Sequence, residues 1–390
     1  MTYHFDDVID RRGTCSLKFD FATERRRPAD VLPLWVADMD FAVAQEILEA
    51  AQRAVTHGIW GYTETKAAYF EALDGWFGAR FGYRVDQKWV IKTPGVVTAL
   101  ALAVQAYTQP GDAVLIQQPV YYPFASVVVD NRRRLVNSPL VLRGGRYEID
   151  FDDFEAKIAG ERVKLFLLCS PHNPVGRVWR RQELTRMAEI CLQHGVVMAS
   201  DEIHCDFAWE PHKHIVLPTL GPEIAQNCVL CTSAAKTFNI AGLQVSNIII
   251  ENPALRQQFQ QAVDAIGYSQ VNTFGLLCTQ AAYLHGDDWL RQARAYIRDN
   301  IEWLRAWLPQ HLPQVQLIIP EGTFLLWLDF RASGVPAPAQ RAFLEQKAHL
   351  WLDSGSMFGS GGDGFQRINA ACPRATLAQA MTQLKSSLLL

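Results

Sequence analysis

The chain has 390 residues, of which 49% are hydrophobic and 20% charged, and its formal net charge is −3. This composition is typical of a globular protein and favours neither nucleic acid nor an anionic membrane as a partner. The length predicts two or three domains, or one large domain with a smaller one. No apolar run approaches the roughly 20 residues of a membrane-spanning helix.

The N-terminal segment Met1–Asp7 carries acidic residues before any apolar stretch, unlike a secretory signal. Eight cysteines are scattered along the chain, with Cys228 and Cys231 as a close pair. Without an export signal we expect reduced thiols and a cytoplasmic protein. Residues three apart on a strand face opposite sides of a sheet, so we predict no metal site at this pair.

Residues 90–250 predict a large α/β domain. Short apolar runs in this region predict strands that are buried on both faces, which is typical of a mostly parallel sheet covered by helices on both sides. Between two of these strands, Arg181–His194 has apolar residues at helical spacing and stops at Gly195, a common helix terminator. The predicted strands are residues 113–117, 163–169, 196–200, 228–232 and 245–250.

The C-terminal part predicts a smaller α+β domain. Trp289–Leu308 forms a long amphipathic pattern that Pro309 and Pro313 are expected to end, and residues 335–339 are expected to form a loop. Strands are predicted over residues 315–319 and 323–329. We therefore predict three parts, namely an N-terminal segment (1–45) that joins the small domain, a large domain (46–285) and a small C-terminal domain (286–390).

Three polar residues, Asn173, Asp201 and Lys236, each follow a predicted strand of the large domain. Ligands of open α/β sheets bind beyond the carboxyl ends of the strands, so we expect these side chains to meet in one crevice. An amine that can bond to an aldehyde, an acid that can pair with a pyridine nitrogen and an amide that can donate to a phenolic oxygen are together what pyridoxal phosphate requires. The sequence therefore predicts a pyridoxal-phosphate site with Lys236 as covalent anchor and as general base and acid.

Further residues are predicted to complete this crevice. Gly95 stands at the start of a predicted helix, whose first backbone N–H groups are free to bind a phosphate. A serine hydroxyl can bind the same phosphate. We expect Tyr121 to stack on the cofactor ring, with Tyr122 as the alternative. The predicted phosphate contacts are Gly95, Val96, Val97 and Ser233.

A carboxylate site is predicted near the C-terminus at Arg367, because a planar guanidinium binds a carboxylate through two parallel hydrogen bonds. Arg374 is the alternative for this role. His212 and His214 lie in a loop with no acidic residue at useful spacing, so we expect both to be solvated.

Six motifs make the chain resemble the fold-type I pyridoxal-phosphate enzymes and, within them, the MalY/PatB cystathionine β-lyase branch. The resemblance covers essentially the whole chain. The lysine, aspartate and asparagine motifs mark the superfamily, whereas the first, fourth and last motifs also mark the branch. The motifs are Leu34–Phe41, His57–Tyr62, Ser170–Gly176, Ser200–His204, Ser233–Asn239 and Arg367–Arg374.

The resemblance implies a homodimer with active sites at the subunit boundary. By this resemblance Tyr62 reaches the phosphate bound by the other subunit, Arg367 binds the substrate carboxylate, and Ala37 lines the substrate site through its backbone. His204 lies beside the cofactor at a position that is tyrosine in common aminotransferases. Histidine is usual in the lyase branch, so this residue favours a lyase.

The implied reaction is the elimination of a thiol from L-cystathionine or a related S-substituted cysteine, which leaves pyruvate and ammonia. Two alternatives stay open. One is an aminotransferase on the same fold, and the other is a non-catalytic regulator or interaction protein that uses the fold. The motifs do not identify the preferred substrate, because pocket shape decides which leaving group fits.

Overall fold

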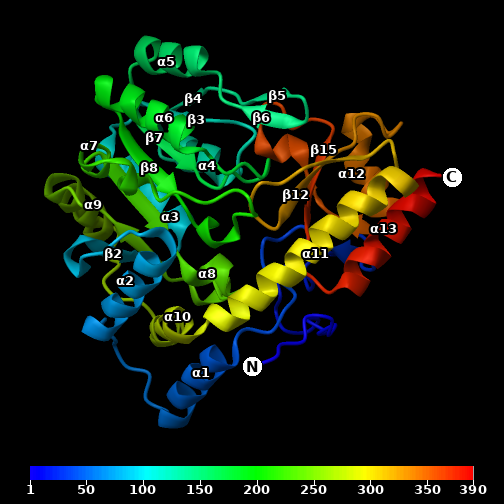
Figure 1. The fold of residues 1–390 in the computed structure, drawn as a ribbon, viewed down its shortest axis with the longest axis horizontal. Coiled ribbons are helices and arrows are strands. Elements are labelled where there is room, and N and C mark those ends of the chain that lie inside the picture. The colour runs from blue at the N-terminus through cyan, green and yellow to red at the C-terminus, as the bar shows by residue number, and fades with distance from the viewer. Residues whose placement is uncertain (390) are drawn as a thin grey trace.

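A seven-stranded sheet runs through the centre of the larger part of the computed structural model, which describes residues 1–389 (Figure 1). The strand order is β2-β10-β9-β8-β7-β3-β4, and every neighbouring pair is parallel except the two that involve β10. The strands are β2 (Val90–Thr93), β3 (Ala113–Ile116), β4 (Arg134–Asn137), β7 (Val163–Cys169), β8 (Val197–Asp201), β9 (Cys228–Thr232) and β10 (Ser246–Ile249).

Helices cover both faces of this sheet, as predicted (Figure 1). Each face of the sheet packs in its own apolar cluster, because successive residues of a strand point to opposite faces. In β7, Leu165 and Leu167 pack in one cluster, and Phe166 packs in the other. Cys228 and Cys231 also fall in different clusters, so they face opposite sides of the sheet. The helices are α3 (Val96–Tyr107), α4 (Pro123–Val129) and α9 (Pro253–Ala265) on one face, and α5 (Phe151–Gly160), α6 (Arg181–Gln193) and α7 (Pro222–Ala225) on the other.

The five predicted strands of this sheet are all present within one residue of their predicted ends. Helix α6 also matches, and Gly195 follows it with a left-handed φ of 64°. The sequence analysis missed β2 and β4, which lie at the two edges of the sheet. Edge strands are exposed on one side and therefore carry polar residues that interrupt the apolar run.

A second, antiparallel sheet of four strands lies in the C-terminal part, in the order β11-β12-β15-β14. Its strands are β11 (Gln316–Ile318), β12 (Leu325–Asp329), β14 (Asp353–Ser354) and β15 (Phe365–Asn369), and its helices are α11 (Asp287–His311), α12 (Ala337–Gln346) and α13 (Arg374–Leu388). The prediction that Pro309 ends the long helix was wrong, because a proline in the last turn removes only one hydrogen bond. Helix α12 begins inside the predicted loop, with Pro338 in its first turn, where proline is tolerated.

The first forty residues pack against the C-terminal sheet. Strand β1 (Leu32–Pro33) pairs in parallel with β13 (Leu350–Trp351), and the Trp35 ring stacks on the Trp351 ring at 4.4 Å. A buried ion pair of 2.7 Å between Lys18 Nζ and Asp40 Oδ2 holds the segment in place. The boundaries at residues 45 and 285 remain a prediction, since one apolar cluster includes residues of both sheets.

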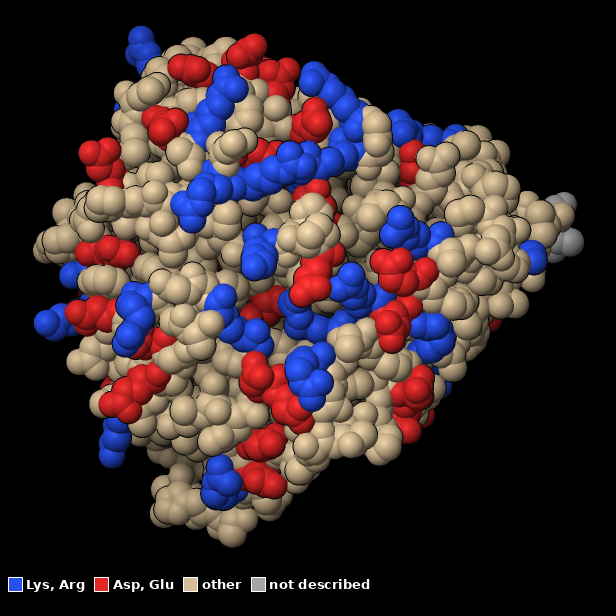
Figure 2. All heavy atoms as spheres, viewed as in Figure 1, with Lys and Arg blue, Asp and Glu red and all other residues tan. Residues whose placement is uncertain are grey.

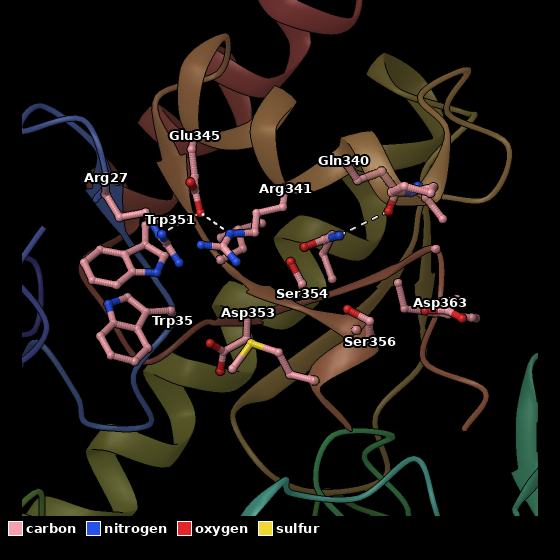
Figure 3. Close-up of a pocket in the computed structure, with 18 of the residues that line it drawn as sticks. Arg27, Trp35, Gln340, Arg341, Glu345, Trp351, Asp353, Ser354, Ser356 and Asp363 are labelled. Atoms are coloured by element: carbon pink, nitrogen blue, oxygen red, sulfur yellow. Dashed lines mark hydrogen bonds and ion pairs between the residues drawn. The ribbon is translucent and has the colours of Figure 1, made fainter. Parts of the chain in front are cut away.

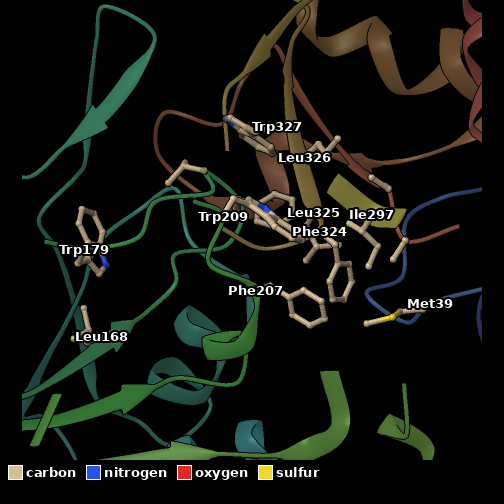
Figure 4. Close-up of a cluster of buried hydrophobic side chains, with 14 of the residues drawn as sticks. Met39, Leu168, Trp179, Phe207, Trp209, Ile297, Phe324, Leu325, Leu326 and Trp327 are labelled. Atoms are coloured by element: carbon tan, nitrogen blue, oxygen red, sulfur yellow. The ribbon is translucent and has the colours of Figure 1, made fainter. Parts of the chain in front are cut away.

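That shared cluster fills the space between the two sheets. Figure 4 shows Phe207, from the loop after β8, beside Phe324 of the C-terminal part, and their ring centroids are 4.9 Å apart. The loops at the carboxyl ends of β7 and β8 are thus packed against the second sheet. The remaining elements are α1 (Gln45–His57), α2 (Ala67–Phe81), α10 (Thr273–His285) and the hairpin of β5 (Val141–Arg143) and β6 (Arg146–Glu148).

The surface carries both signs of charge. Figure 2 shows acidic and basic side chains interspersed over the visible face. Among residues 1–389, no helix combines the length and the apolar character needed to cross a membrane. In the same part of the chain, no group of three or more histidine, cysteine or acidic residues is placed to hold a metal ion.

Candidate active site

A cavity of about 430 Å³ lies at the carboxyl ends of β7, β8 and β9. Most of the predicted site residues line it, although they come from segments far apart in the sequence. Arg367 does not line the cavity but donates a hydrogen bond to Asn173 in its wall. Tyr62 borders a different hollow on the surface. The predicted residues in the wall are Ala37, Gly95, Val96, Val97, Tyr121, Asn173, Asp201, His204, Ser233 and Lys236.

Lys236 lies on the short helix α8 (Ala234–Thr237), directly after β9. The side chain of Ser233 caps this helix by accepting a hydrogen bond of 3.1 Å from the N–H of Ala235. The Lys236 Nζ donates to the backbone oxygen of Ala37 at 2.8 Å. Burial lowers the pKa of Lys236 to about 8, although the nearby Asp38 acts in the opposite direction. Near neutral pH an appreciable fraction of this amine is therefore unprotonated and nucleophilic.

Asp201 is the last residue of β8 and is 6% exposed. Its Oδ1 accepts a hydrogen bond of 3.1 Å from the N–H of Ile203, and within residues 1–389 no basic side chain forms an ion pair with it. Burial raises the pKa of Asp201 to about 7. A buried carboxylate without a cation is costly, so the site favours a ligand that brings a positively charged N–H group to this position.

His204 lines the same cavity with an imidazole that is neutral at physiological pH. Burial lowers the pKa of His204 to about 3, with Lys236 and Arg367 acting in the same direction. The ring packs edge-on against Phe324 with centroids 5.6 Å apart, and Nδ1 is buried without a hydrogen-bond partner among residues 1–389. His204 can thus contribute a neutral aromatic face or a hydrogen bond, but not a charge.

The N-terminus of α3 offers free backbone donors to an anion. Gly95 precedes the helix with a φ of 130°, a conformation that favours glycine, and the first N–H groups of the helix have no partner within it. Ser246 lines the cavity, and its hydroxyl is buried with no hydrogen-bond partner in the described chain. The Ser233 hydroxyl, in contrast, donates to the Val245 oxygen at 2.6 Å. Ser246, which the sequence analysis missed, is therefore more available to a phosphate than Ser233.

The structure distinguishes the two candidate tyrosines. Tyr121 lines the cavity, and its N–H donates to the oxygen of Asn173 at 3.0 Å. Tyr122 is not part of the wall, and its ring lies 6.1 Å from the ring of Phe358. The position of Tyr121 therefore agrees with the predicted stacking role, and that of Tyr122 does not.

Arg367 lies on β15 of the second sheet, and its guanidinium contacts Asn173 in the cavity wall. Nη1 donates to Asn173 Oδ1 at 3.1 Å, and Nη2 donates to the backbone oxygen of Trp35 at 2.8 Å and pairs with the buried Asp353. The alternative, Arg374, instead donates to Asn300 of α11 at 2.6 Å. The guanidinium beside the cavity is thus that of Arg367, held in place by a buried carboxylate.

His214 is not solvated, contrary to the prediction. Its Nε2 lies 2.7 Å from Glu202 Oε2, and both side chains are buried. Glu202 also accepts from the Ser200 hydroxyl at 2.9 Å, which places this pair directly behind Asp201. The contact forms because the loop before η3 (Leu217–Leu220) folds back onto the end of β8, which residue spacing alone does not reveal.

Tyr62 is separate from the cavity of its own chain. Its side chain is 96% exposed and borders a surface hollow formed with residues 267–274. The loop between α1 and α2 therefore presents this tyrosine to the exterior. Within one chain, Tyr62 does not contribute to the site.

These features fit pyridoxal phosphate. The cavity combines an amine with a lowered pKa, a buried acid without a cation, and an unpartnered hydroxyl beside a helix N-terminus. Lys236 would hold the aldehyde carbon, Asp201 the ring nitrogen, and α3 with Ser246 the phosphate. The fold already brings these groups to one cavity, so holding the cofactor requires no rearrangement of the chain.

Comparison with known proteins gives the family. The family model described as aminotransferase class I and II matches residues 29–384. The chain belongs to this family. It is 41% identical to the cystathionine beta-lyase PatB of Bacillus subtilis, over 99% of this chain and 100% of that protein. It is 34% identical to the protein MalY of Escherichia coli, over 98% of each chain.

A solved structure confirms the fold class. The crystal structure of cystalysin from Treponema denticola, which contains a pyridoxal 5'-phosphate cofactor, is similar over 100% of this chain and 99% of that chain. The TM-score is 0.96 at 34% sequence identity. The resemblance to the MalY/PatB branch predicted from the sequence motifs is thus confirmed.

Proposed function

We propose that the protein is a pyridoxal-phosphate-dependent C–S β-lyase that converts L-cystathionine or a related S-substituted L-cysteine to a thiol, pyruvate and ammonia. The main support is one arrangement, in which the amine of Lys236 and the unpaired acid Asp201 line the same buried cavity. The full-length identity of 41% to PatB supports the same reaction class.

The chain supplies the contacts that bind and orient the cofactor. When bound, pyridoxal phosphate stabilises negative charge at the substrate Cα through its protonated ring. Asp201 keeps the ring nitrogen protonated, since a buried carboxylate favours a neighbouring cation. Tyr121 would pack against the ring, and the Asn173 amide nitrogen would donate to the phenolic oxygen.

Arg367 and Lys236 act on the substrate. Arg367 binds the α-carboxylate and directs the Cα–H bond toward the Lys236 amine, which removes the proton. The bond between Cβ and sulfur then breaks, its electron pair leaves with sulfur, and the thiol takes up a proton. The remaining three-carbon fragment reacts with water to give pyruvate and ammonia, so the overall reaction needs one water molecule and no second substrate.

The proposal includes a homodimer with active sites shared between subunits. The loop that carries Tyr62 also exposes Ile59 (72%) and Trp60 (61%). These side chains border hollows beside α10 that include the exposed Leu277 and Leu284. Large apolar side chains that cluster on a surface favour an interface, and a second copy would cover them while Tyr62 enters its site.

The proposal also places the enzyme in the cytoplasm. All eight cysteines are free thiols, and seven of them are buried. Thiols that stay unpaired in the folded chain are compatible with a reducing compartment.

Mixing two inactive variants should restore activity if Tyr62 serves the other subunit. In a heterodimer of Tyr62→Phe with Lys236→Ala, one site has both defects and the other has neither. We expect the mixture to exceed the summed activity of the two homodimers, once subunit exchange is complete. Co-purification of an untagged variant with an affinity-tagged one verifies the exchange. Proven exchange without any gain in activity would remove Tyr62 from the neighbouring site.

The family name also allows an aminotransferase. The products formed in the absence of a 2-oxo acid distinguish a lyase from an aminotransferase. A lyase releases the amino group as ammonia and turns over repeatedly, whereas an aminotransferase retains it and stops. With L-cystathionine alone, we expect homocysteine, pyruvate and ammonia in equal amounts over many turnovers. A single turnover that resumes only after a 2-oxo acid is added would establish the aminotransferase instead.

A further inference from the structure

A second cavity, of about 730 Å³, lies beside residues that hold Arg367, and Figure 3 shows its lining. It is enclosed by the N-terminal segment, α12, and strands β14 and β15. Trp35 and Asp353 form part of its wall, and these two residues also hold Nη2 of Arg367. This space, here named the distal cavity, therefore adjoins the proposed α-carboxylate site.

One wall of the distal cavity is a stack of four side chains. The Arg25 guanidinium lies 5.4 Å from the Trp35 ring, the two tryptophan rings stack at 4.4 Å, and the Arg27 guanidinium lies 5.4 Å from the Trp351 ring. Figure 3 shows Arg27, Trp351 and Trp35 side by side. Stacking occupies the ring faces and leaves the N–H edges for hydrogen bonds. The Trp35 Nε1 is buried without a hydrogen-bond partner among residues 1–389.

Three guanidiniums line the distal cavity, those of Arg25, Arg27 and Arg341, and of its three carboxylates Asp353 is already paired with Arg367. Glu345 Oε1 lies 2.7 Å from Arg27 Nε and 3.1 Å from Arg341 Nε, so a single carboxylate serves two guanidiniums (Figure 3). In the described part of the chain, Arg25 has no acidic partner. Burial lowers the pKa of Arg27, and the charges of Arg341 and Arg25 act in the same direction, which agrees with the crowding of three cations. An anion would relieve this crowding.

The cavity also contains hydrogen-bond acceptors. Gln366 donates to Gln340 at 3.1 Å, while its own Oε1 is buried without a partner in residues 1–389. Asp363 adds an exposed carboxylate to the lining. Because the lining offers both donors and acceptors, it suits a group with a carboxylate and an ammonium better than it suits a dianion without an ammonium. The volume lies within the range of small-molecule sites, roughly 300–1,000 Å³.

We propose that the distal cavity binds the carboxylate-bearing end of a small molecule, with the amino-acid group as the preferred form. The molecule has two sources: the homocysteine half of L-cystathionine, whose other half occupies the Arg367 site, or a separate small carboxylate. The first source rests on the proposed lyase function. In either case Arg25, which has no acidic partner, is the guanidinium that is free to bind the ligand carboxylate.

Substrates with and without a distal carboxylate test the first source. Arg25→Gln should lower kcat/KM for L-cystathionine about tenfold, since a charge-assisted hydrogen bond is lost, and leave S-methyl-L-cysteine unchanged. Arg26→Gln is the matched control, because Arg26 is the next residue, is exposed and does not line the cavity.

Calorimetric titration of the holoenzyme with succinate tests the second source without any turnover. Succinate lacks an amine and cannot replace the lysine at the cofactor. Weaker succinate binding in Arg25→Gln than in Arg26→Gln, with both substrates unaffected, would assign the cavity to a separate carboxylate.

If neither substrate selectivity nor succinate binding depends on Arg25, the distal cavity is not a carboxylate site. A wild-type protein that turns over neither substrate but binds succinate through Arg25 would refute the lyase function and leave the cavity assignment standing.

Discussion

Replacing Lys236 by alanine is expected to lower kcat for L-cystathionine by about 10³-fold or more, because the variant loses both the covalent anchor and the general base. No other lysine lines the cavity in residues 1–389. The steady-state rate of pyruvate formation measures the loss. Burial lowers the pKa of this amine to about 8, which favours the unprotonated form that can act as a base.

The Lys236→Ala variant should still bind the cofactor, since α3, Ser246 and Asp201 are unchanged. Absorbance of the bound cofactor after gel filtration tests this point. Lys213→Ala is the control, because Lys213 is exposed in the loop after β8 and should retain full activity. Borohydride treatment of the wild-type holoenzyme followed by peptide mapping should label the peptide of Lys236. A label on a different lysine would overturn the assignment.

The centre of the site could be predicted because it follows from topology. Asp201 ends β8, Asn173 and Lys236 lie a few residues beyond the ends of β7 and β9, and parallel strands bring their carboxyl ends to one edge of the sheet. A short apolar run reveals such a strand without any knowledge of packing. The mostly parallel sheet with covered faces could be predicted for the same reason.

Other parts of the site depend on tertiary contacts and could not be predicted. Ser246 lines the cavity because β10 runs antiparallel to β9 and pairs with β2, and single-sequence patterns do not reveal strand direction. Asp353 meets Arg367 through the pairing of β14 with β15. His214 meets Glu202 through a loop that folds back onto β8. Each is a polar residue whose partner lies on a different element, so its spacing in the sequence carries no signal.

The position of Arg367 links the two sheets, since its strand belongs to the second sheet and its guanidinium contacts Asn173 of the first. The substrate carboxylate would thus bind where the two parts of the chain meet. Asp353 and the Trp35 oxygen both accept from Nη2 and Asn173 Oδ1 accepts from Nη1, which fixes the plane of the guanidinium and leaves Nε and the second N–H of Nη1 for the substrate. The buried Nε has no hydrogen-bond partner among residues 1–389, in keeping with a donor that awaits a ligand.

Arg367→Ala is expected to lower kcat/KM about 10²- to 10³-fold, with KM raised and kcat reduced together. The carboxylate contact both binds the substrate and aligns its Cα–H bond with Lys236, so its loss affects ground state and transition state alike. Arg367→Lys should recover little, because an ammonium cannot form two parallel hydrogen bonds. Steady-state kinetics on L-cystathionine and S-methyl-L-cysteine should give equal losses, since both substrates carry the same α-carboxylate.

Two further variants separate binding from positioning around Arg367. Asp353→Asn removes the charge that fixes the guanidinium but keeps a hydrogen-bond acceptor, so we expect a smaller loss of about tenfold, mainly in KM. Arg374→Ala removes a contact with Asn300 on α11 and should lower the unfolding temperature more than the activity. The opposite pattern, a crippled Arg374→Ala enzyme beside a nearly normal Arg367→Ala enzyme, would transfer the carboxylate site to Arg374.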